Sequence, residues 1–174
     1  MSQLPNQLVS FAEIKAVVKS FSANIDEQKV NSCVIESQNV DIKPLIGEQV
    51  YIALIEGETV PTKYQSLMTG CIYTYNDLKY KFEGLKSTII YFAYARIIKS
   101  LDNSVSAGGF VQKTNDYSQH SQIKERLNAA NEAESIGNTY LKECVDYLKR
   151  NNDLFSEFGY YRLKKVQSIR ALGD

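Results

Sequence analysis

The residues that could carry out acid–base, nucleophilic or metal chemistry are few and far apart in this sequence. The single histidine, His120, lies in a polar stretch with no partner at a useful spacing, which favours a solvated side chain over a catalytic base. The three cysteines, Cys33, Cys71 and Cys144, form no CxxC pair, so the sequence predicts neither a structural zinc site nor a disulfide framework. Their odd number and wide spacing fit a reducing compartment.

Paired carboxylates are also poorly placed for catalysis. Glu132 and Glu134 would face different sides of a helix, and Glu56 and Glu58 flank a turn, so neither pair has the buried setting of a general acid and base. The sequence contains no nucleophile elbow, phosphate-binding loop or HExxH motif. We therefore predict a protein that is not an enzyme and holds no cofactor or metal ion. An enzyme with an unrecognised site is a minor alternative.

The elements that would position any site are mainly helical. Residues 84–101 are apolar on nearly every side without an internal glycine or proline, which indicates a buried central helix. Residues 120–150 repeat apolar positions at steps of three and four, with charges opposite, which predicts a long amphipathic helix. Gly137 should kink or divide this helix, or sit under a neighbour. The apolar stripe of the long helix comprises Ile123, Leu127, Ala130, Ala133, Ile136, Tyr140, Leu141, Cys144, Tyr147 and Leu148.

Shorter helices are predicted in the N-terminal half. One is expected near residues 10–20, and a second is expected to begin after Asp26 as N-cap and to stop before Pro44. Residues 45–55 and 61–68 should form two more, with Pro44 in the first turn of the former. The buried set of the helix over 45–55 would be Leu45, Ile46, Val50, Tyr51, Leu54 and Ile55.

The spacing of the apolar residues changes in the middle of the chain, from a helical to an alternating pattern. Residues 71–82 alternate around a polar Asn76-Asp77 tip, which predicts a β-hairpin with Ile72, Thr74, Leu78, Tyr80 and Phe82 as the alternating set. Residues 102–119 are rich in Ser, Asn, Gly and Asp and are expected to form a long loop, with a short extended piece over 109–113.

The predicted organisation is one helical domain over residues 1–150 and an extended C-terminal arm over 151–174. Asn151-Asn152 would break the long helix, and the arm is aromatic first and then basic. Two arrangements of the arm remain open. It could extend and dock on a partner through its aromatic residues, or these residues could fold back onto the core of the subunit.

Composition sets the remaining bounds. The chain has 174 residues with a formal net charge of +0, so no overall field draws it to DNA or to an anionic membrane. Its first residues lack the basic and apolar regions of a signal peptide, and no apolar stretch is long enough to predict a membrane span.

Five phrases, in order, resemble a known class of protein. They are DIKPLIGEQVY (41–51), IYTYNDLKYKFEGLK (72–86), YFAYARII (91–98), FVQKTNDYS (110–118) and NEAESIGNTYLKECVDYL (131–148). The series, which covers roughly residues 26–155, resembles head-to-tail connector (adaptor ring) proteins of tailed phages that infect gut Bacteroidetes, including crAss-like phages. The resemblance implies a mainly α-helical fold, a virion location at the head–tail junction and host cytoplasm during assembly. It also implies a ring of about a dozen copies.

The partners that this resemblance implies are further copies of the chain, the portal protein, a tail or second ring protein, and genomic DNA that passes without sequence-specific contact. No membrane partner is expected. The long loop would provide ring contacts through Gly109, Phe110, Gln112, Lys113, Asn115 and Tyr117. The arm would bind the portal through Phe155, Phe158, Tyr160, Tyr161, Arg162, Lys164 and Lys165. The competing hypothesis is a small helical DNA-binding or DNA-packaging-associated phage protein, because cations beside tyrosines can contact phosphates and stack on bases.

Overall fold

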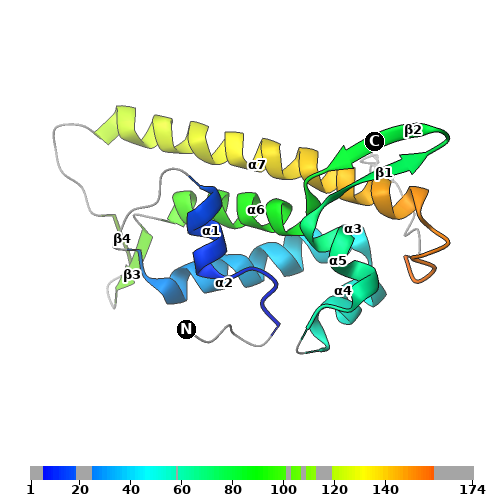
Figure 1. The fold of residues 1–174 in the computed structure, drawn as a ribbon. Coiled ribbons are helices and arrows are strands. Elements are labelled where there is room, and N and C mark those ends of the chain that lie inside the picture. Colours follow the sequence, from blue (N-terminus) through cyan, green and yellow to red (C-terminus); the bar gives the residue numbers. More distant parts are fainter. Residues whose placement is uncertain are drawn as a thin grey trace, which may run out of the picture.

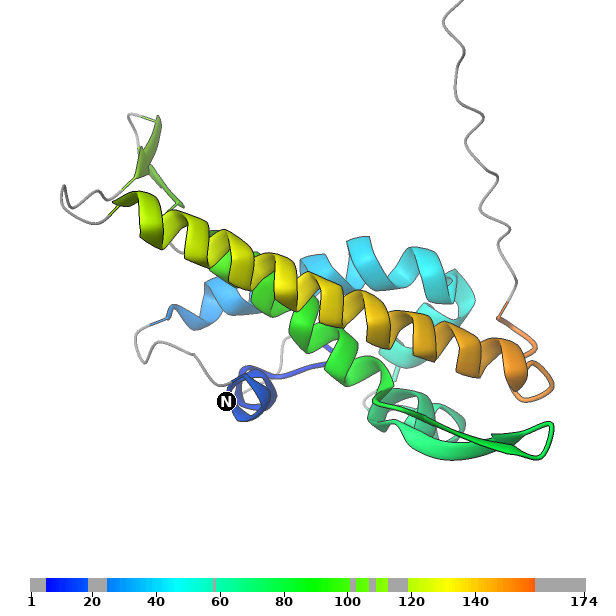
Figure 2. The same cartoon turned by 90° about the horizontal axis from the view of Figure 1, so that it is seen from above.

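This mainly α-helical protein is organised around two antiparallel helices, as a computed structural model shows (Figure 1). The structure describes residues 6–18, 25–57, 59–100, 103–106, 109–112 and 119–158. The central helix α6 (Gly84–Ser100) lies along the long helix α7 (Gln119–Arg150), and the shorter helices cover the other sides of α6 (Figure 2). The predicted fold class, a helical bundle with a small β-hairpin, is confirmed.

The packing of α6 against α7 explains why residues 84–101 are so apolar. The ring of Phe92 is 6% exposed and lies directly over Gly137, where a Cβ atom would meet the ring carbons at 3.3 Å. Gly137 therefore sits under a neighbour and does not divide α7. The buried Thr88 hydroxyl donates a hydrogen bond to the Gly84 carbonyl at 3.2 Å and lies 3.7 Å from the Cys144 sulfur.

The N-terminal helices begin at side-chain caps. A capping box between Ser10 and Glu13 starts α1 (Phe11–Val17). Asp26 caps α2 (Glu27–Ser37) as predicted, since its carboxylate accepts a hydrogen bond from the Gln28 amide. The salt bridge from Lys86 to Glu13, at 2.5 Å, then ties α1 to α6.

The predicted boundary before Pro44 is wrong. The α2 helix continues through a π-helical turn, η1 (Gln38–Ile42), into α3 (Lys43–Ile46), which accommodates Pro44 in its first turn. Gly47, with φ +86°, then separates α3 from α4 (Glu48–Ile55). The expected single helix over 45–55 is thus two, and Leu45 is 38% exposed instead of buried.

The π-helical turn begins at a buried glutamine. The Gln38 side chain is fully buried, accepts the Leu8 amide at 2.8 Å and donates to the Asn6 carbonyl at 2.9 Å. It also lies 3.4 Å from the Tyr51 hydroxyl, which donates to Asn39 at 3.1 Å. Because a buried amide must be fully hydrogen-bonded, this network fixes the N-terminal segment to α2 and α4.

The predicted β-hairpin is present, and its faces are shifted by one residue in the first strand. Strands β1 (Cys71–Tyr75) and β2 (Leu78–Phe82) follow α5 (Thr62–Thr69) and join through Asn76 and Asp77, whose φ angles of 50° and 62° suit a two-residue turn. Tyr73 pairs with Tyr80 and Ile72 with Lys81. Ile72 and Thr74 therefore do not share the face of Leu78, Tyr80 and Phe82.

The base of this hairpin is a contact between two glycine backbones. Gly70 and Gly84 have φ angles of +79° and +85°, and a Cβ on Gly84 would lie 2.4 Å from the Gly70 nitrogen. Only glycine allows both the positive φ and this approach of the chain to itself.

Two further expectations need correction. Residues 103–106 and 109–112, expected to lie in a loop with one extended piece, form a second antiparallel hairpin of strands β3 (Asn103–Ser106) and β4 (Gly109–Gln112). In addition, Phe155 and Phe158, expected as free anchors of the arm, are 1% and 6% exposed and belong to the core. The packed body therefore reaches Phe158, beyond the predicted boundary at residue 150.

Candidate interaction surfaces

The groups capable of chemistry are scattered in the described part of the chain. Burial raises the pKa of the Cys144 thiol to about 12, so the thiol stays protonated at neutral pH. Burial also raises the pKa values of Cys33 and Cys71. Glu134 forms a 2.6 Å salt bridge with Lys99. Across residues 6–18, 25–57 and the other described ranges, no three His, Cys, Asp or Glu side chains lie together as a metal site requires.

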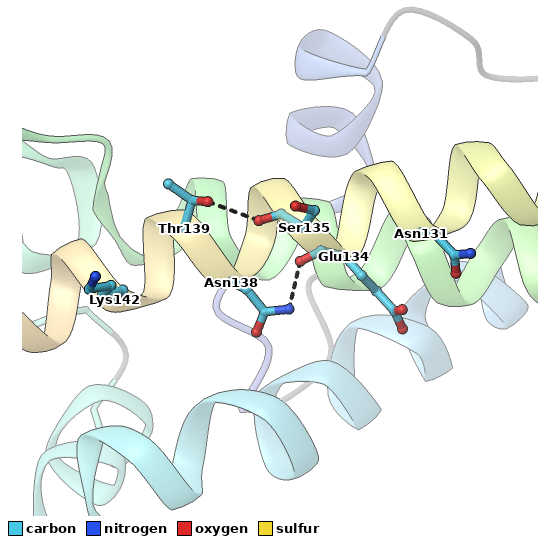
Figure 3. Close-up of a pocket in the computed structure, with 6 residues that line it drawn as sticks. All are labelled: Asn131, Glu134, Ser135, Asn138, Thr139 and Lys142. Carbon is cyan, nitrogen blue, oxygen red and sulfur yellow. Dashed lines mark hydrogen bonds between the residues drawn. The ribbon is translucent and has the colours of Figure 1, made fainter.

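A shallow depression follows the free face of α7 (Figure 3). Its lining residues are all on this one helix and are all polar: Asn131, Glu134, Ser135, Asn138, Thr139 and Lys142. The Asn138 amide donates to the Glu134 carbonyl at 2.9 Å, and the Thr139 hydroxyl donates to the Ser135 carbonyl at 3.0 Å. The Asn138 and Thr139 side chains are thus satisfied by their own helix, while the Glu134 carboxylate pairs with Lys99 on α6. The depression is a solvated helix face without convergent reactive groups.

The stripe predicted for α7 is incomplete at its N-terminal end. Leu127, expected in the core, is 49% exposed, whereas Ala130, Leu141, Cys144 and Leu148 are buried as predicted. The reason is the length of the partner helix. The α7 helix has 32 residues and α6 has 17, so the first turns of α7 extend past the end of the central helix.

An aromatic and cationic cluster fixes the β1–β2 hairpin to the other end of α7. The Tyr147 ring stacks on Phe82 at 4.4 Å between centroids and meets Tyr73 edge-on at 5.0 Å. The Arg150 guanidinium donates to the Tyr73 hydroxyl at 2.9 Å and lies 3.8 Å from the centre of the Tyr80 ring. These contacts hold one face of the hairpin against α7 and leave its tip exposed.

The root of the C-terminal arm is held by a charged hydrogen-bond cluster. The Tyr64 hydroxyl and the Lys63 ammonium both bond to the Glu157 carboxylate. Burial alone would raise the pKa of Glu157, but the hydrogen bonds from Lys63 and Tyr64 outweigh it and lower this pKa to about 2. Burial and the bond to Glu157 raise the pKa of Tyr64. Beside them the Tyr64 and Phe155 rings stack at 5.7 Å.

The predicted contact residues are therefore split among several places. Gly109, Phe110 and Gln112 lie in strand β4, while Lys113, Asn115 and Tyr117 lie outside the described residues. Phe155 and Phe158 are in the core. The remaining arm residues, Tyr160, Tyr161, Arg162, Lys164 and Lys165, also lie outside the described residues, as does the side chain of His120.

Sequence reasoning missed two features of the surface. The first is the exposed hairpin residue Ile72, whose orientation follows once the two-residue turn fixes the register Tyr75–Leu78 and Ile72–Lys81. The second is the bidentate ion pair of Arg96 with Asp41, at 2.8 Å, which joins α6 to η1. The sequence gives no signal for this pair, because its partners are 55 positions apart.

Comparison with known proteins places the chain by its sequence. Residues 42–163, well over half of the chain, match the family described as "Family of unknown function (DUF6712)". The chain belongs to this family. The match within DUF6712 begins at the end of η1 and runs past α7, so it includes the hairpins, α6 and the root of the arm. No curated protein and no solved structure matches the chain. Among the described helices, none combines the length and apolar content needed to cross a bilayer.

Proposed function

We propose that this DUF6712 protein is a structural subunit of a tailed-phage head-to-tail connector, which assembles as a ring below the portal and joins the capsid to the tail. The observation that carries the proposal is the placement of the two β-hairpins at opposite ends of the α6–α7 pair (Figure 1). A ring of identical subunits needs two different surfaces on each subunit that face its two neighbours. Hairpins at both ends of one packed helix pair meet this requirement.

Two other properties support the proposal. Ion pairs tie α1 and η1 to the central helix α6, and a further ion pair ties the arm root to α5, so that these separate segments are held in one folded body, as a structural subunit requires. The chain has a formal net charge of +0, so a channel built from it would not retain DNA by phosphate attraction. The sequence phrases that resemble connector proteins lie mostly within the DUF6712 match.

The test is assembly with phage components. The full chain would be expressed with and without the portal protein of a phage that encodes it, and complexes would be isolated and imaged by negative-stain electron microscopy. We expect stoichiometric co-purification with the portal and with virions, and rings of about a dozen copies. If the protein is absent from purified virions and does not associate with the portal, the connector proposal is wrong. Retention of DNA that weakens with salt would favour a DNA-binding protein instead.

A further inference from the structure

The β1–β2 hairpin is a two-stranded ribbon that projects clear of the helices (Figure 2). Within the ranges that the structure describes, no backbone group from outside the hairpin is hydrogen-bonded to β1 or β2, so the ribbon has two open edges. The backbone of α7 runs closer to β2 than to β1, which leaves β1 as the strand farther from the helix. An open edge presents unpaired N–H and C=O groups on which a further strand can pair.

The register shows which backbone groups point outward from β1. Tyr75 and Leu78 flank a two-residue turn, so they form a hydrogen-bonded pair, and such pairs recur at every second residue of an antiparallel ladder. The intervening residues of β1 are Ile72 and Thr74, whose N–H and C=O groups therefore point away from β2. Their side chains lie on the exposed face of the ribbon.

The two edges differ in charge. By the same alternation, the outward-pointing backbone groups of β2 belong to Lys79 and Lys81, whose side chains are exposed. Lysines on an edge strand oppose its pairing with another chain, and the exposed salt bridge from Lys81 to Glu83 offsets this little. Strand β1 (Cys71–Tyr75) contains no charged residue, and its Ile72 is 68% exposed. Charge therefore protects the β2 edge and leaves the β1 edge open to pairing.

The β1 edge is complementary to a second copy of itself. Ile72 and Thr74 flank Tyr73 symmetrically, so antiparallel pairing about a two-fold axis at Tyr73 places Ile72 opposite Thr74 of the partner subunit. Both of the resulting pairs can exchange their backbone hydrogen bonds, and no charge is brought near another. The same operation at the β2 edge would place Lys79 opposite Lys81, and like charges directly opposite destabilise a sheet. Self-pairing is thus favoured at β1 alone.

We propose that two copies of this chain pair through their β1 strands about a two-fold axis and form a four-stranded antiparallel sheet, in the order β2–β1–β1–β2. The lysine-bearing β2 strands become the outer edges, so the sheet stops there and the contact is closed. The turn, the Gly70–Gly84 contact and the Arg150 guanidinium over Tyr80 already fix the ribbon, so pairing costs little conformational entropy. This contact does not rest on the connector proposal.

The first test is sedimentation velocity of the full chain over a range of concentrations, in which wild type should form dimers. Thr74→Pro removes an outward N–H from β1 without removing a bond between β1 and β2, and it should raise the dimer dissociation constant at least about tenfold. The matched control is Lys79→Pro, which removes the corresponding N–H from the β2 edge and should change this constant less than about twofold. Equal melting temperatures of the two variants would show that both fold alike.

Three results would overturn the proposal. One is a wild-type chain that stays monomeric up to about 0.1 mM. Another is equal association of wild type and Thr74→Pro, and rings that form equally in both would still leave the connector proposal standing. The third is a monomeric wild type whose portal binding is lost in Thr74→Pro, because the portal would then be the occupant of the β1 edge.

The second test uses the native Cys71, whose thiol is free. The proposed register places Cys71 opposite Tyr75 of the partner subunit in a non-hydrogen-bonded pair, where Cα atoms lie about 4.5 Å apart and a disulfide can form. Oxidised Tyr75→Cys should therefore give covalent dimers, and the addition of Cys71→Ser should abolish them. The control is Leu78→Cys, an exposed position beside the same turn on β2. Equal cross-linking of Tyr75→Cys and Leu78→Cys would contradict the proposed pairing.

Discussion

Replacing Glu157 by Gln tests whether the root of the C-terminal arm is part of the folded body. The lowering of the Glu157 pKa from 4.5 to about 2 corresponds to roughly 3.4 kcal/mol of preference for the charged form, at about 1.36 kcal/mol per pKa unit. This figure is a ceiling, because Glu157 is 23% and Lys63 is 48% exposed and solvent screens the pair. We expect Glu157→Gln to lower the free energy of unfolding by about 1–2 kcal/mol at pH 7.

The pH dependence distinguishes a charge effect from a loss of packing. A carboxylate whose pKa is lower in the folded than in the unfolded state stabilises the fold fully above its unfolded pKa, near 4.5. That stabilisation is lost as the pH falls through about 2. The difference between wild type and Glu157→Gln should therefore be full at pH 7 and should shrink steadily below pH 4.5.

The assay is urea unfolding followed by circular dichroism at several pH values, with Glu132→Gln as the matched control. Glu132 is exposed on α7, and its replacement should change stability by less than about 0.5 kcal/mol. Raising the salt concentration should reduce the Glu157 effect. No difference between Glu157→Gln and wild type at pH 7 would show that the Lys63–Tyr64–Glu157 cluster does not hold the arm root. A difference independent of pH would refute the electrostatic reasoning.

Three further outcomes are expected. Phe92→Ala should lower the free energy of unfolding by about 3–5 kcal/mol in chemical denaturation, because it opens a cavity over Gly137. A loss below about 1 kcal/mol would show that α6 is not central. Gly84→Ala should lower the free energy of unfolding by about 1–3 kcal/mol, since the φ angle of Gly84 is +85° and a Cβ there would meet the Gly70 nitrogen. An unchanged melting temperature would contradict this backbone contact. Deletion of residues 153–174 should lower the melting temperature far more than deletion of 159–174, because only the longer deletion removes Phe155 from the core. Equal effects of the two deletions would mean that the arm is not part of the core from residue 151 onward.

The sequence predicted the elements whose signal is local. The period of α7, the Asp26 cap of α2 and the two-residue turn at Asn76-Asp77 each depend on neighbours within a few positions, and all three are present. The apolar content of residues 84–101 likewise identified the buried helix without knowledge of what covers it. These features needed no tertiary information.

The errors arise where tertiary contacts override the local pattern. Leu127 continues the apolar period of α7 but lies past the end of α6, so nothing in its own spacing reveals that it is exposed. The Asn151-Asn152 break ended α7 as expected, but the chain then turns back, so that Phe155 packs on Tyr64 and Tyr147. The continuation of α2 through a π-helical turn was also missed; the turn begins at Gln38, whose buried amide bonds to the backbone of Asn6 and Leu8, more than 25 positions away.

Because of the contact between Gly70 and Gly84, the length of the β1–β2 ribbon is independent of the helices on either side of it. The chain enters and leaves the ribbon at one point, so a longer or shorter ribbon need not alter the paths of α5 and α6. Adding one residue to each strand near the tip would preserve the face that packs on Tyr147 and extend the ribbon by about 3.3 Å. Ribbon length therefore sets how far a subunit reaches, in steps of one cross-strand pair, without a change in its helices.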